Sequence, residues 1–451
     1  VRPRVGRHAA NRAGTGRARG SLANSGALVS NGGNSQDRVA MRTLFNENLR
    51  FLASNARWLA AGFLLTLFSS FGQTFFIGLS GNDLRATFQL SGGEFGVLYM
   101  VATLASASTL PLLGRTLDLM PGWKVACFTM PALALACVLM VLAPNVVVLG
   151  ITLYMLRLFG QGMMTEIAFT ETGRWFVANR GKAMALIVPG QPLGSAVLPL
   201  IVAVTTVASG NWRTPWIMSA VVIALVGMPL IITLMRVERQ PQSTDVKSPV
   251  SHTARDWTRA EVVRDPVLYL LLVGLLAPPF IGTTIFFHQG YLTELRGYSA
   301  LAFAAAFPVN SVATVVFGFV CGHLIDRYGA LRLLPYVLLP LALASLAVAL
   351  ITPVWGVYAF MFLLGISNGF SGTLMGALWP EVYGLANLGG IRSIIIAAMV
   401  LSTAMGPGIT GTLIDLGISL PVQMFGMAAW CVISSGFLAV AAARIRARAG
   451  T

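Results

Sequence analysis

The sequence predicts an all-α membrane protein whose twelve transmembrane helices form two related six-helix bundles. Three observations lead to this fold class. Of the 451 residues, 56 % are hydrophobic and only 10 % are charged, and the mean hydropathy is +0.75. The apolar residues fall into runs of about 20 residues without a two-residue period, which is typical of helices that cross a bilayer core about 30 Å thick. The two halves of the chain also share sequence patterns.

The apolar runs predict the twelve spans in order. They lie near residues 58–79, 95–113, 125–143, 147–169, 184–208, 216–235, 267–290, 301–321, 333–351, 355–377, 393–414 and 424–443. Each is expected to be a helix, because backbone polar groups in hydrocarbon need partners within the protein. A polar stretch divides the spans six and six. The expected organisation is a first bundle at 41–236, a cytoplasmic linker loop at 237–266 and a second bundle at 267–445.

The first forty residues differ in composition from the rest of the chain. They contain seven arginines, no lysine, seven glycines and a single acidic residue, Asp37. They hold no apolar run long enough for a secretory signal. The chain begins with Val1, whereas Met41 opens a juxtamembrane segment. We expect residues 1–40 to be a disordered tail or an over-extended start, with an Arg-rich organellar transit peptide as the alternative.

Basic residues predict the orientation of the spans. With the amino terminus in the cytoplasm, the cytoplasmic segments after residue 40 carry 20 Lys and Arg, and the outer loops carry three: Arg85, Arg213 and Arg296. Lys and Arg collect in the cytoplasmic loops of membrane proteins. We therefore expect a multi-pass protein of a bacterial inner membrane with both termini cytoplasmic. The net charge of +15 is attributed to this bias beside membrane lipid, and not to nucleic-acid binding.

Three matches in order indicate an internal repeat. The segment "GRTLDLMPGWK" (114–124) precedes "GHLIDRYGALR" (322–332) by 208 positions. "FFIGLSGNDLR" (75–85) aligns with "FFHQGYLTELR" (286–296), and Trp175 aligns with Trp379 after the fourth and tenth spans. Paired repeats are common in transporters, whose substrate sites lie at the repeat interface near the membrane midplane.

Polar residues inside the predicted spans follow a three-helix rhythm. Asp, Glu, Lys, Arg, His, Asn and Gln occur there nine times, and the first, fourth, seventh and tenth spans hold seven of the nine. The third, sixth, ninth and twelfth spans hold none. The rhythm indicates that every third helix faces lipid and that the first helix of each triplet lines a polar interior. We therefore predict a substrate or proton pathway formed by Gln73, Arg157, Gln161, Gln191, His288, Gln289, Asn310 and Asn368.

Arg157 is the most costly of these residues, because it lies about ten residues, or about 15 Å, into its span. A central arginine costs about 2.5–3.5 kcal/mol and is normally retained for a partner or a cavity. It is either part of an anion or proton-linked site or a structural residue that bonds neighbouring carbonyls. Gln161 shares its face, whereas Glu166 lies near the cytoplasmic end and is not paired with it. His288 is either solvated or a proton relay.

Other chemistry finds no support in the sequence. Cys127, Cys137, Cys321 and Cys431 fall inside apolar runs and are interpreted as small packing residues. No cysteine or histidine spacing indicates a metal site. A nucleotide-binding glycine loop and a catalytic triad spacing are also missing. We expect neither an enzyme, nor ATP-driven transport within this chain, nor a cofactor.

At this point the sequence resembles the major facilitator superfamily over essentially all of residues 41–445. The second repeat loop resembles the family's cytoplasmic motif through Gly322, Leu324, Asp326, Arg327 and Gly329, with Arg332 following. The first loop is a degenerate copy with Gly114, Asp118, Gly122 and Lys124, in which Leu119 replaces the usual base. The resemblance implies that such loops hold neighbouring helix ends together while the carrier faces outward. We expect Asp326 to form the stronger contact and Asp118 the weaker one.

Two further segments extend the resemblance. "RLFGQG" (157–162) resembles the family's motif in the fourth helix, with Arg157 as its arginine. "RWFVANRGKAMA" (174–185), with Trp175 and Arg180, resembles the loop after the fourth helix in the monocarboxylate and oxalate–formate branch. The acidic first-helix pattern of that branch is missing. Trp379, Glu381 and Arg392 are expected in the equivalent cytoplasmic loop of the second half.

The expected function is secondary active transport by a monomer. The solute is predicted to be a small organic anion such as a monocarboxylate, coupled to protons and moved by alternating access. A proton-driven multidrug or metabolite exporter of the same fold is the alternative. A membrane sensor or scaffold that transports nothing is an alternative of another class. Measurement of monocarboxylate uptake under an imposed pH gradient would distinguish the anion carrier from the exporter.

Overall fold

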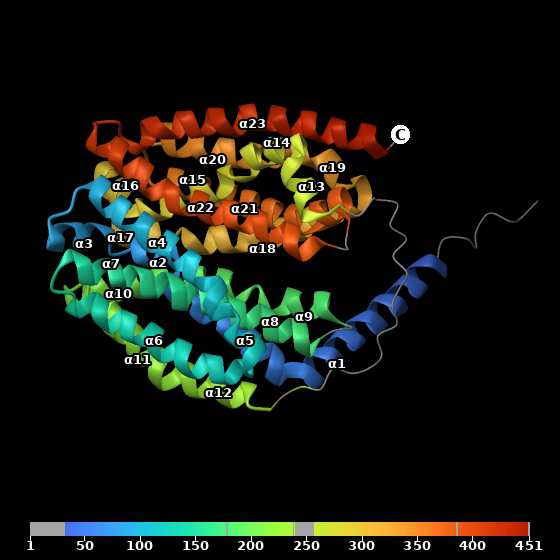
Figure 1. Cartoon of the computed structure of the whole chain (residues 1–451), viewed down its shortest axis with the longest axis horizontal. Helices are drawn as coiled ribbons and strands as arrows, with labels where there is room; N and C mark the ends of the chain where they lie inside the picture. The colour runs from blue at the N-terminus through green and yellow to red at the C-terminus, as the bar shows by residue number, and fades with distance from the viewer. Residues whose placement is uncertain (1–31, 177–178, 238, 240–256, 385–386, 450–451) are drawn as a thin grey trace, which may run out of the picture. The chain divides into compact units, whose positions relative to one another are not determined.

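The structure, a computed structural model, describes residues 32–176, 179–237, 239, 257–384 and 387–449. This part of the chain is helical and contains no β-strand (Figure 1). The chain divides into two compact units, residues 1–56 and 57–451. Helix α1 (Gly32–Phe68) begins inside the segment expected to be disordered, so residues 32–40 are helical in the structure. The rest of that expectation, for residues 1–31, lies outside the described residues.

Twelve helical segments of the described chain are long and apolar enough to cross a membrane, as the sequence predicts. They are Arg50–Gly78, Gly92–Leu119, Gly122–Leu142, Val146–Trp175, Gly181–Ser209, Thr214–Met235, Pro266–Phe287, Ala300–Tyr328, Ala330–Leu350, Trp355–Tyr383, Gly390–Asp415 and Leu420–Arg448. The second, fourth, eighth, tenth and twelfth run several residues beyond their predicted ends, because the helices continue through polar and charged residues past the apolar run.

The first six spans are built from short and long helices. After α1 they comprise α2 (Thr74–Gly78), α3 (Gly81–Phe88), α4 (Gly92–Gly114), α5 (Thr116–Leu119), α6 (Gly122–Leu142), α7 (Val146–Met155), α8 (Thr165–Trp175), α9 (Arg180–Ile187), α10 (Gly190–Ser209), α11 (Thr214–Val221) and α12 (Met228–Met235). A 3₁₀ turn at Ser69–Gly72 interrupts the first span, and π-helical segments at Leu156–Met164 and Val222–Gly227 interrupt the fourth and sixth.

The second six spans follow a short helix at the end of the linker. The elements are α13 (Arg259–Arg264), α14 (Pro266–Leu275), α15 (Ala277–Phe287), α16 (Gln289–Arg296), α17 (Ala300–Ala304), α18 (Phe307–Tyr328), α19 (Ala330–Leu333), a 3₁₀ turn (Leu334–Tyr336), α20 (Leu339–Leu350), α21 (Trp355–Tyr383), α22 (Leu388–Asp415) and α23 (Leu420–Ala449). Most of the linker before α13 lies outside the described residues.

Large apolar side chains cover the outside of the second unit. Val207, Leu225 and Phe319 each expose more than 70 % of their surface. A water-soluble protein rarely leaves so many large aliphatic and aromatic side chains uncovered. Lipid is therefore the solvent for this face, as the composition predicts.

The two bundles pack against each other through α4 with α22, α10 with α18, and α2 with α15. The hydrogen bonds that join described residues of the two bundles all lie in one half of the spans, between their middle and one end. That end carries α3 and α16 (left in Figure 1). We call this the closed end. Phe95 of α4 stacks on Phe287 of α15 there, with ring centroids 4.8 Å apart.

Glycines permit the close approach at the closed end. A methyl group on Gly96 of α4 would overlap the Pro407 carbonyl of α22, and one on Gly411 of α22 would overlap the Gly92 carbonyl. Larger side chains at these positions would push the helices apart, since close-packed backbones leave no room for a Cβ atom. The contact of α4 with α22 therefore depends on glycine on both sides.

The opposite end carries residues 114–124 and 322–332, and we call it the motif end. Between described residues of the two bundles, no hydrogen bond or ion pair is formed there. In the second bundle the linker is fixed at this end, because Arg448 of α23 bonds both oxygens of Asp265 at 2.8 Å. Burial alone would raise the pKa of the Asp265 carboxyl, but the bonds from Arg448, the Val267 amide and Tyr383, with the Arg448 charge, together hold the pKa below its usual value.

Candidate substrate site and gates

The first membrane span is broken near its middle. Helix α1 ends at Phe68, the chain makes a tight turn through Ser69–Gly72, and Gln73 adopts an extended backbone with ψ of 152° before α2 resumes the helix. A break of this kind frees backbone groups that an intact helix would pair internally. In membrane proteins such backbone is tolerated only where protein or a polar cavity satisfies it.

Arg157 lies directly against this break. Its side chain is buried, with 4 % of the residue exposed, and its Nη1 donates to the Gly72 carbonyl at 3.4 Å and to the Thr74 hydroxyl at 3.3 Å. The guanidinium also lies 5.4 Å from the Tyr99 ring centre, and the Tyr99 and Thr74 hydroxyls are 2.6 Å apart. Gly72 and Thr74, which lie on either side of Gln73, and Tyr99 of α4 thus hold the Arg157 guanidinium in place.

The π-helical segment that carries Arg157 packs on the same break. A methyl group on Gly160 would lie 2.6 Å from the Gly72 Cα atom, so two glycines meet where the first and fourth spans cross. The sequence "RLFGQG" supplies both the arginine and the glycine that permits this contact. Single π-helical turns are rare and occur frequently at functional sites.

The charge on Arg157 has no carboxylate partner among the described residues. Its acceptors are a carbonyl and a hydroxyl, and its Nε atom is buried without any partner. A buried cation that is paired only with neutral groups favours binding of an anion, because a negative charge nearby lowers the electrostatic cost of burial. The arrangement can therefore hold a carboxylate or another small anion beside the break in the first span.

Two predicted polar residues lie in this region. Gln73 is the extended residue of the break itself and is half-buried. Gln161 lies one turn after Arg157, its backbone nitrogen packs beside Gly72, and its side-chain oxygen is buried without a partner. Gln73, Arg157 and Gln161 therefore occupy one neighbourhood of the first bundle.

The other predicted pathway residues lie elsewhere. Gln191 in α10 is exposed, and Asn368 in α21 is half-buried beside Ser367, whose buried hydroxyl has no partner. Asn310 donates to the Met361 carbonyl at 3.1 Å and so joins α18 to α21. No contact between described residues brings these side chains to Arg157.

His288 and Gln289 belong to the packing of the closed end. Both are buried, at 5 % and 3 % exposure. The His288 Nε2 atom lies 3.1 Å from the Pro407 carbonyl, and Gln289 donates to the Phe75 carbonyl of the other bundle at 2.7 Å. His288 is therefore enclosed by protein, in contrast to the solvated alternative that the sequence left open.

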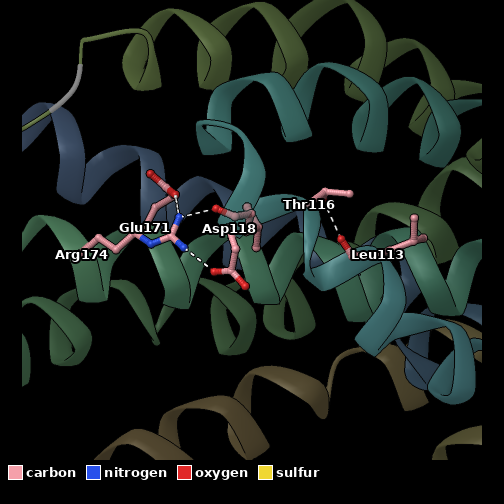
Figure 2. A network of polar contacts seen from close by, with 6 residues as sticks. Leu113, Thr116, Asp118, Glu171 and Arg174 are labelled. Carbon is pink, nitrogen blue, oxygen red and sulfur yellow. Dashed lines mark hydrogen bonds and ion pairs between the residues drawn. The ribbon is translucent and has the colours of Figure 1, made fainter.

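The degenerate repeat loop is held by an ion pair within the first bundle (Figure 2). Arg174 of α8 bonds the Asp118 carboxylate at 2.8 Å, the Glu171 carboxylate at 3.2 Å and the Leu117 carbonyl at 2.6 Å. Gly122 packs on the Glu171 side chain, where a Cβ atom would lie 2.5 Å from Cγ. Gly114 ends α4, and Lys124 lies over the neighbouring Trp123 ring.

The well-matched repeat loop makes fewer contacts in this conformation. Asp326 is exposed and forms no hydrogen bond or ion pair with any described residue, while Arg327 lies over the Tyr328 ring at 5.3 Å. Gly329 turns the chain with a φ of 81°. Gly322 and Leu324 are partly buried, and Arg332 is exposed. In this conformation Asp118 is paired with Arg174, whereas Asp326 has no bond to a described residue. That Asp326 forms the stronger contact in an outward-facing carrier stays a prediction.

The predicted loop residues after the fourth and tenth spans differ in burial. Trp175 is buried and its carbonyl accepts a bond from Arg239, and Trp379 is buried beneath the parallel ring of Tyr383. Glu381 and Arg392 are exposed. The side chain of Arg180 lies outside the described residues.

Three residues of these sites escape prediction from sequence. Thr74 and Tyr99 are common in apolar helices, and nothing in their spacing marks them as partners of Arg157. Asp415 lies one residue past a predicted span, yet it bonds Ser91 and the two following backbone amides across the bundle interface. The sequence feature that could have indicated this contact is "SGGE" (91–94). It is a capping box with two glycines and predicts an accessible helix N-terminus.

The fold and these contacts define a class: a helical membrane protein with a broken first span and two bundles whose described residues bond each other towards one end. A family model described as Major Facilitator Superfamily matches residues 62–407. The chain belongs to this superfamily.

Solved structures share the fold. A bacterial homologue of the human lysosomal transporter Spinster, in an inward-facing and unoccupied conformation, superposes with a TM-score of 0.66 over 88 % of this chain and 98 % of its own, at 16 % identity. A mutant of the nucleoside transporter NupG gives a TM-score of 0.63 over 86 % and 99 %, at 11 % identity. At these identities the likeness concerns the fold alone.

One curated relative has a named activity. The Agnestins efflux protein AgnL12 of Paecilomyces divaricatus is 24 % identical over 303 residues. The match covers 65 % of this chain and 65 % of that protein, so the chain spans slightly less than two thirds of its relative.

Proposed function

We propose that this protein is a secondary active carrier of a small organic anion, such as a monocarboxylate, with protons as the coupling ion. The observation that supports this most is the buried Arg157 guanidinium, which lies at a helix break and whose partners among the described residues are neutral. Gln73 and Gln161 complete the binding region in this proposal. Gln191 and Asn368 line the path along which the anion leaves.

The contacts between the bundles support alternating access. The closed end is held by hydrogen bonds and stacked rings, whereas no described residues of the two bundles are bonded to each other at the motif end. With the orientation expected from the basic residues, the motif end faces the cytoplasm, and this conformation is inward-facing. Asp326, which has no bond to a described residue, fits this proposal, because a latch at the cytoplasmic end would be broken in an inward-facing carrier.

The test is uptake of labelled monocarboxylates into proteoliposomes under an imposed pH gradient. We expect wild-type uptake that is driven by the gradient, and none with Arg157→Ala at equal insertion. Arg157→Lys should recover little, because lysine lacks the planar fork that grips a carboxylate. The control is Arg444→Ala, which removes an exposed arginine of α23. Normal uptake by Arg157→Ala would mean that the arginine is structural.

Proton-driven export of a drug or metabolite is the second candidate, and the similarity to the Agnestins efflux protein favours it. The same vesicles separate the two candidates. Export predicts that an acid interior accelerates uptake of a neutral or cationic solute into inverted vesicles and leaves monocarboxylates excluded. Anion transport predicts that monocarboxylates are taken up and that the neutral or cationic solute is excluded.

A further inference from the structure

A carboxylate from one bundle caps a helix of the other at the closed end. Asp415, the last residue of α22, accepts a hydrogen bond from the Ser91 hydroxyl at 2.6 Å. It also accepts from the backbone amides of Gly92 at 3.0 Å and Gly93 at 2.7 Å. These are the first amides of α4, which have no partner within their own helix. More than 320 residues separate the partners in sequence.

The position of Asp415 is unfavourable for its own helix. An acidic residue at a helix C-terminus faces the negative end of the helix dipole and the last free carbonyls. The same charge is favourable at the N-terminus of α4, where the dipole is positive. Asp415 therefore contributes little to the stability of α22 itself. It stabilises the contact between α22 and α4. A residue that opposes its own helix in this way indicates a role outside that helix.

The local sequence of α4 leaves this N-terminus accessible. Ser91 accepts from the Glu94 amide at 3.0 Å while it donates to Asp415, so its hydroxyl serves both helices. Gly92 and Gly93 have no side chains to cover their amides, and a Cβ atom on Gly93 would lie 2.6 Å from an Asp415 oxygen. The titratable residues near Asp415 are Arg85, Glu94 and the buried His288.

We infer that Asp415 is the latch of the closed end, and that breaking its bonds to residues 91–93 is a required step when this end opens. The inference rests on the alternating-access mechanism proposed above. It places a carboxylate-to-helix contact between the bundles at the end opposite the two repeat loops. The chain would then have separate latches for its two ends.

The test measures distances at both ends by pulsed electron resonance on reconstituted full-length protein. Spin labels are attached to cysteines at two pairs of exposed positions: Val147 with Leu350 at the closed end, and Leu119 with Tyr336 at the motif end. The chain without introduced cysteines gives the labelling background of the four native cysteines. The readout needs no transported solute, so it does not depend on knowing the substrate.

Asp415→Asn should populate a longer closed-end distance and a shorter motif-end distance. We expect the ratio of open to closed to rise about fivefold, which corresponds to about 1 kcal/mol and is typical for loss of a helix cap. Gly93→Ala should have the same effect, because its methyl group would meet both the Asp415 carboxylate and the Thr412 backbone of α22. Glu166→Gln is the control, since Glu166 is an exposed acidic residue of α8 that forms no hydrogen bond or ion pair with any described residue. It should leave the closed-end distance unchanged.

Each outcome decides a separate point. If Asp415→Asn inserts and keeps the wild-type closed-end distances, the latch is refuted. If it fails to insert, Gly93→Ala decides in the same way. If the closed end opens while the motif-end distance stays the same, the latch is supported but the alternating-access proposal is contradicted. Lost transport with unchanged distances at both ends would also overturn the latch.

Discussion

At the scale of single residues, the chemistry of the site depends on how Arg157 is held. Its charge is retained at the centre of a span by the Gly72 carbonyl, the Thr74 hydroxyl and the Tyr99 ring. The sequence predicted the arginine, because a charge inside an apolar run is conspicuous. It could not predict Thr74 or Tyr99, since their role follows from the break in the first span and not from any pattern of their own.

Thr74→Val should weaken the apparent affinity for the transported anion about tenfold, because a hydrogen bond to a charged group contributes about 1.5–3 kcal/mol and this one is long. Valine preserves the shape of threonine and removes only the hydroxyl. The measurement is the concentration dependence of uptake. Thr129→Val is the control, since the Thr129 hydroxyl is buried without a partner. Equal affinities in both variants would show that Thr74 does not position the guanidinium.

At the scale of helices, glycine residues permit the close contacts between elements. The break at Ser69–Gly72 and the π-helical segment at Leu156–Met164 cross through Gly72 and Gly160. Apolar periodicity could predict that both spans exist, because it depends only on composition along the chain. It could not predict the interruptions, which lie where the two backbones approach at Gly72 and Gly160 and where the Arg157 side chain bonds the freed Gly72 carbonyl.

Gly160→Ala should lower the thermal unfolding midpoint in detergent and reduce transport. Its methyl group would lie 2.6 Å from the Gly72 Cα atom, and overpacking of this kind costs about 1–3 kcal/mol. Gly436→Ala in α23 is the matched control, because no heavy atom lies within 4 Å of its added Cβ. It should be neutral or slightly stabilising, as alanine is the better helix former. Equal midpoints would argue against the close crossing.

The two repeat loops give a prediction that depends on conformation. Asp118→Asn removes the ion pair with Arg174, but both side chains are largely exposed, so the loss of stability should stay below about 1 kcal/mol. Asp326→Asn should not change the stability of this conformation, because Asp326 has no partner among the described residues. It should nevertheless slow transport if Asp326 latches the opposite conformation. Thermal unfolding in detergent and uptake rates on the same preparations separate the two effects. A stability loss with Asp326→Asn exceeding that with Asp118→Asn would contradict this account.

At the scale of the whole molecule, the number of spans and the division into two halves could be predicted, because hydrophobic length and the repeat are properties of the chain itself. The contact between the halves could not. Asp415 fell one residue beyond a predicted span, and the buried Gln423 of α23 also fell just outside one. Residues at helix ends are the least certain part of any prediction from apolar runs, and here such a residue joins the bundles.

The central claim is that Arg157 recognises a negative charge on the transported solute. The most direct measurement compares initial uptake rates of a labelled monocarboxylate and its uncharged amide, by the wild type and by Arg157→Ala, at equal amounts of inserted protein. We predict that the wild type prefers the carboxylate by at least about tenfold, corresponding to about 1.4 kcal/mol, and that Arg157→Ala loses this preference. The same preference in both proteins, or faster uptake of the amide by the wild type, would contradict the account.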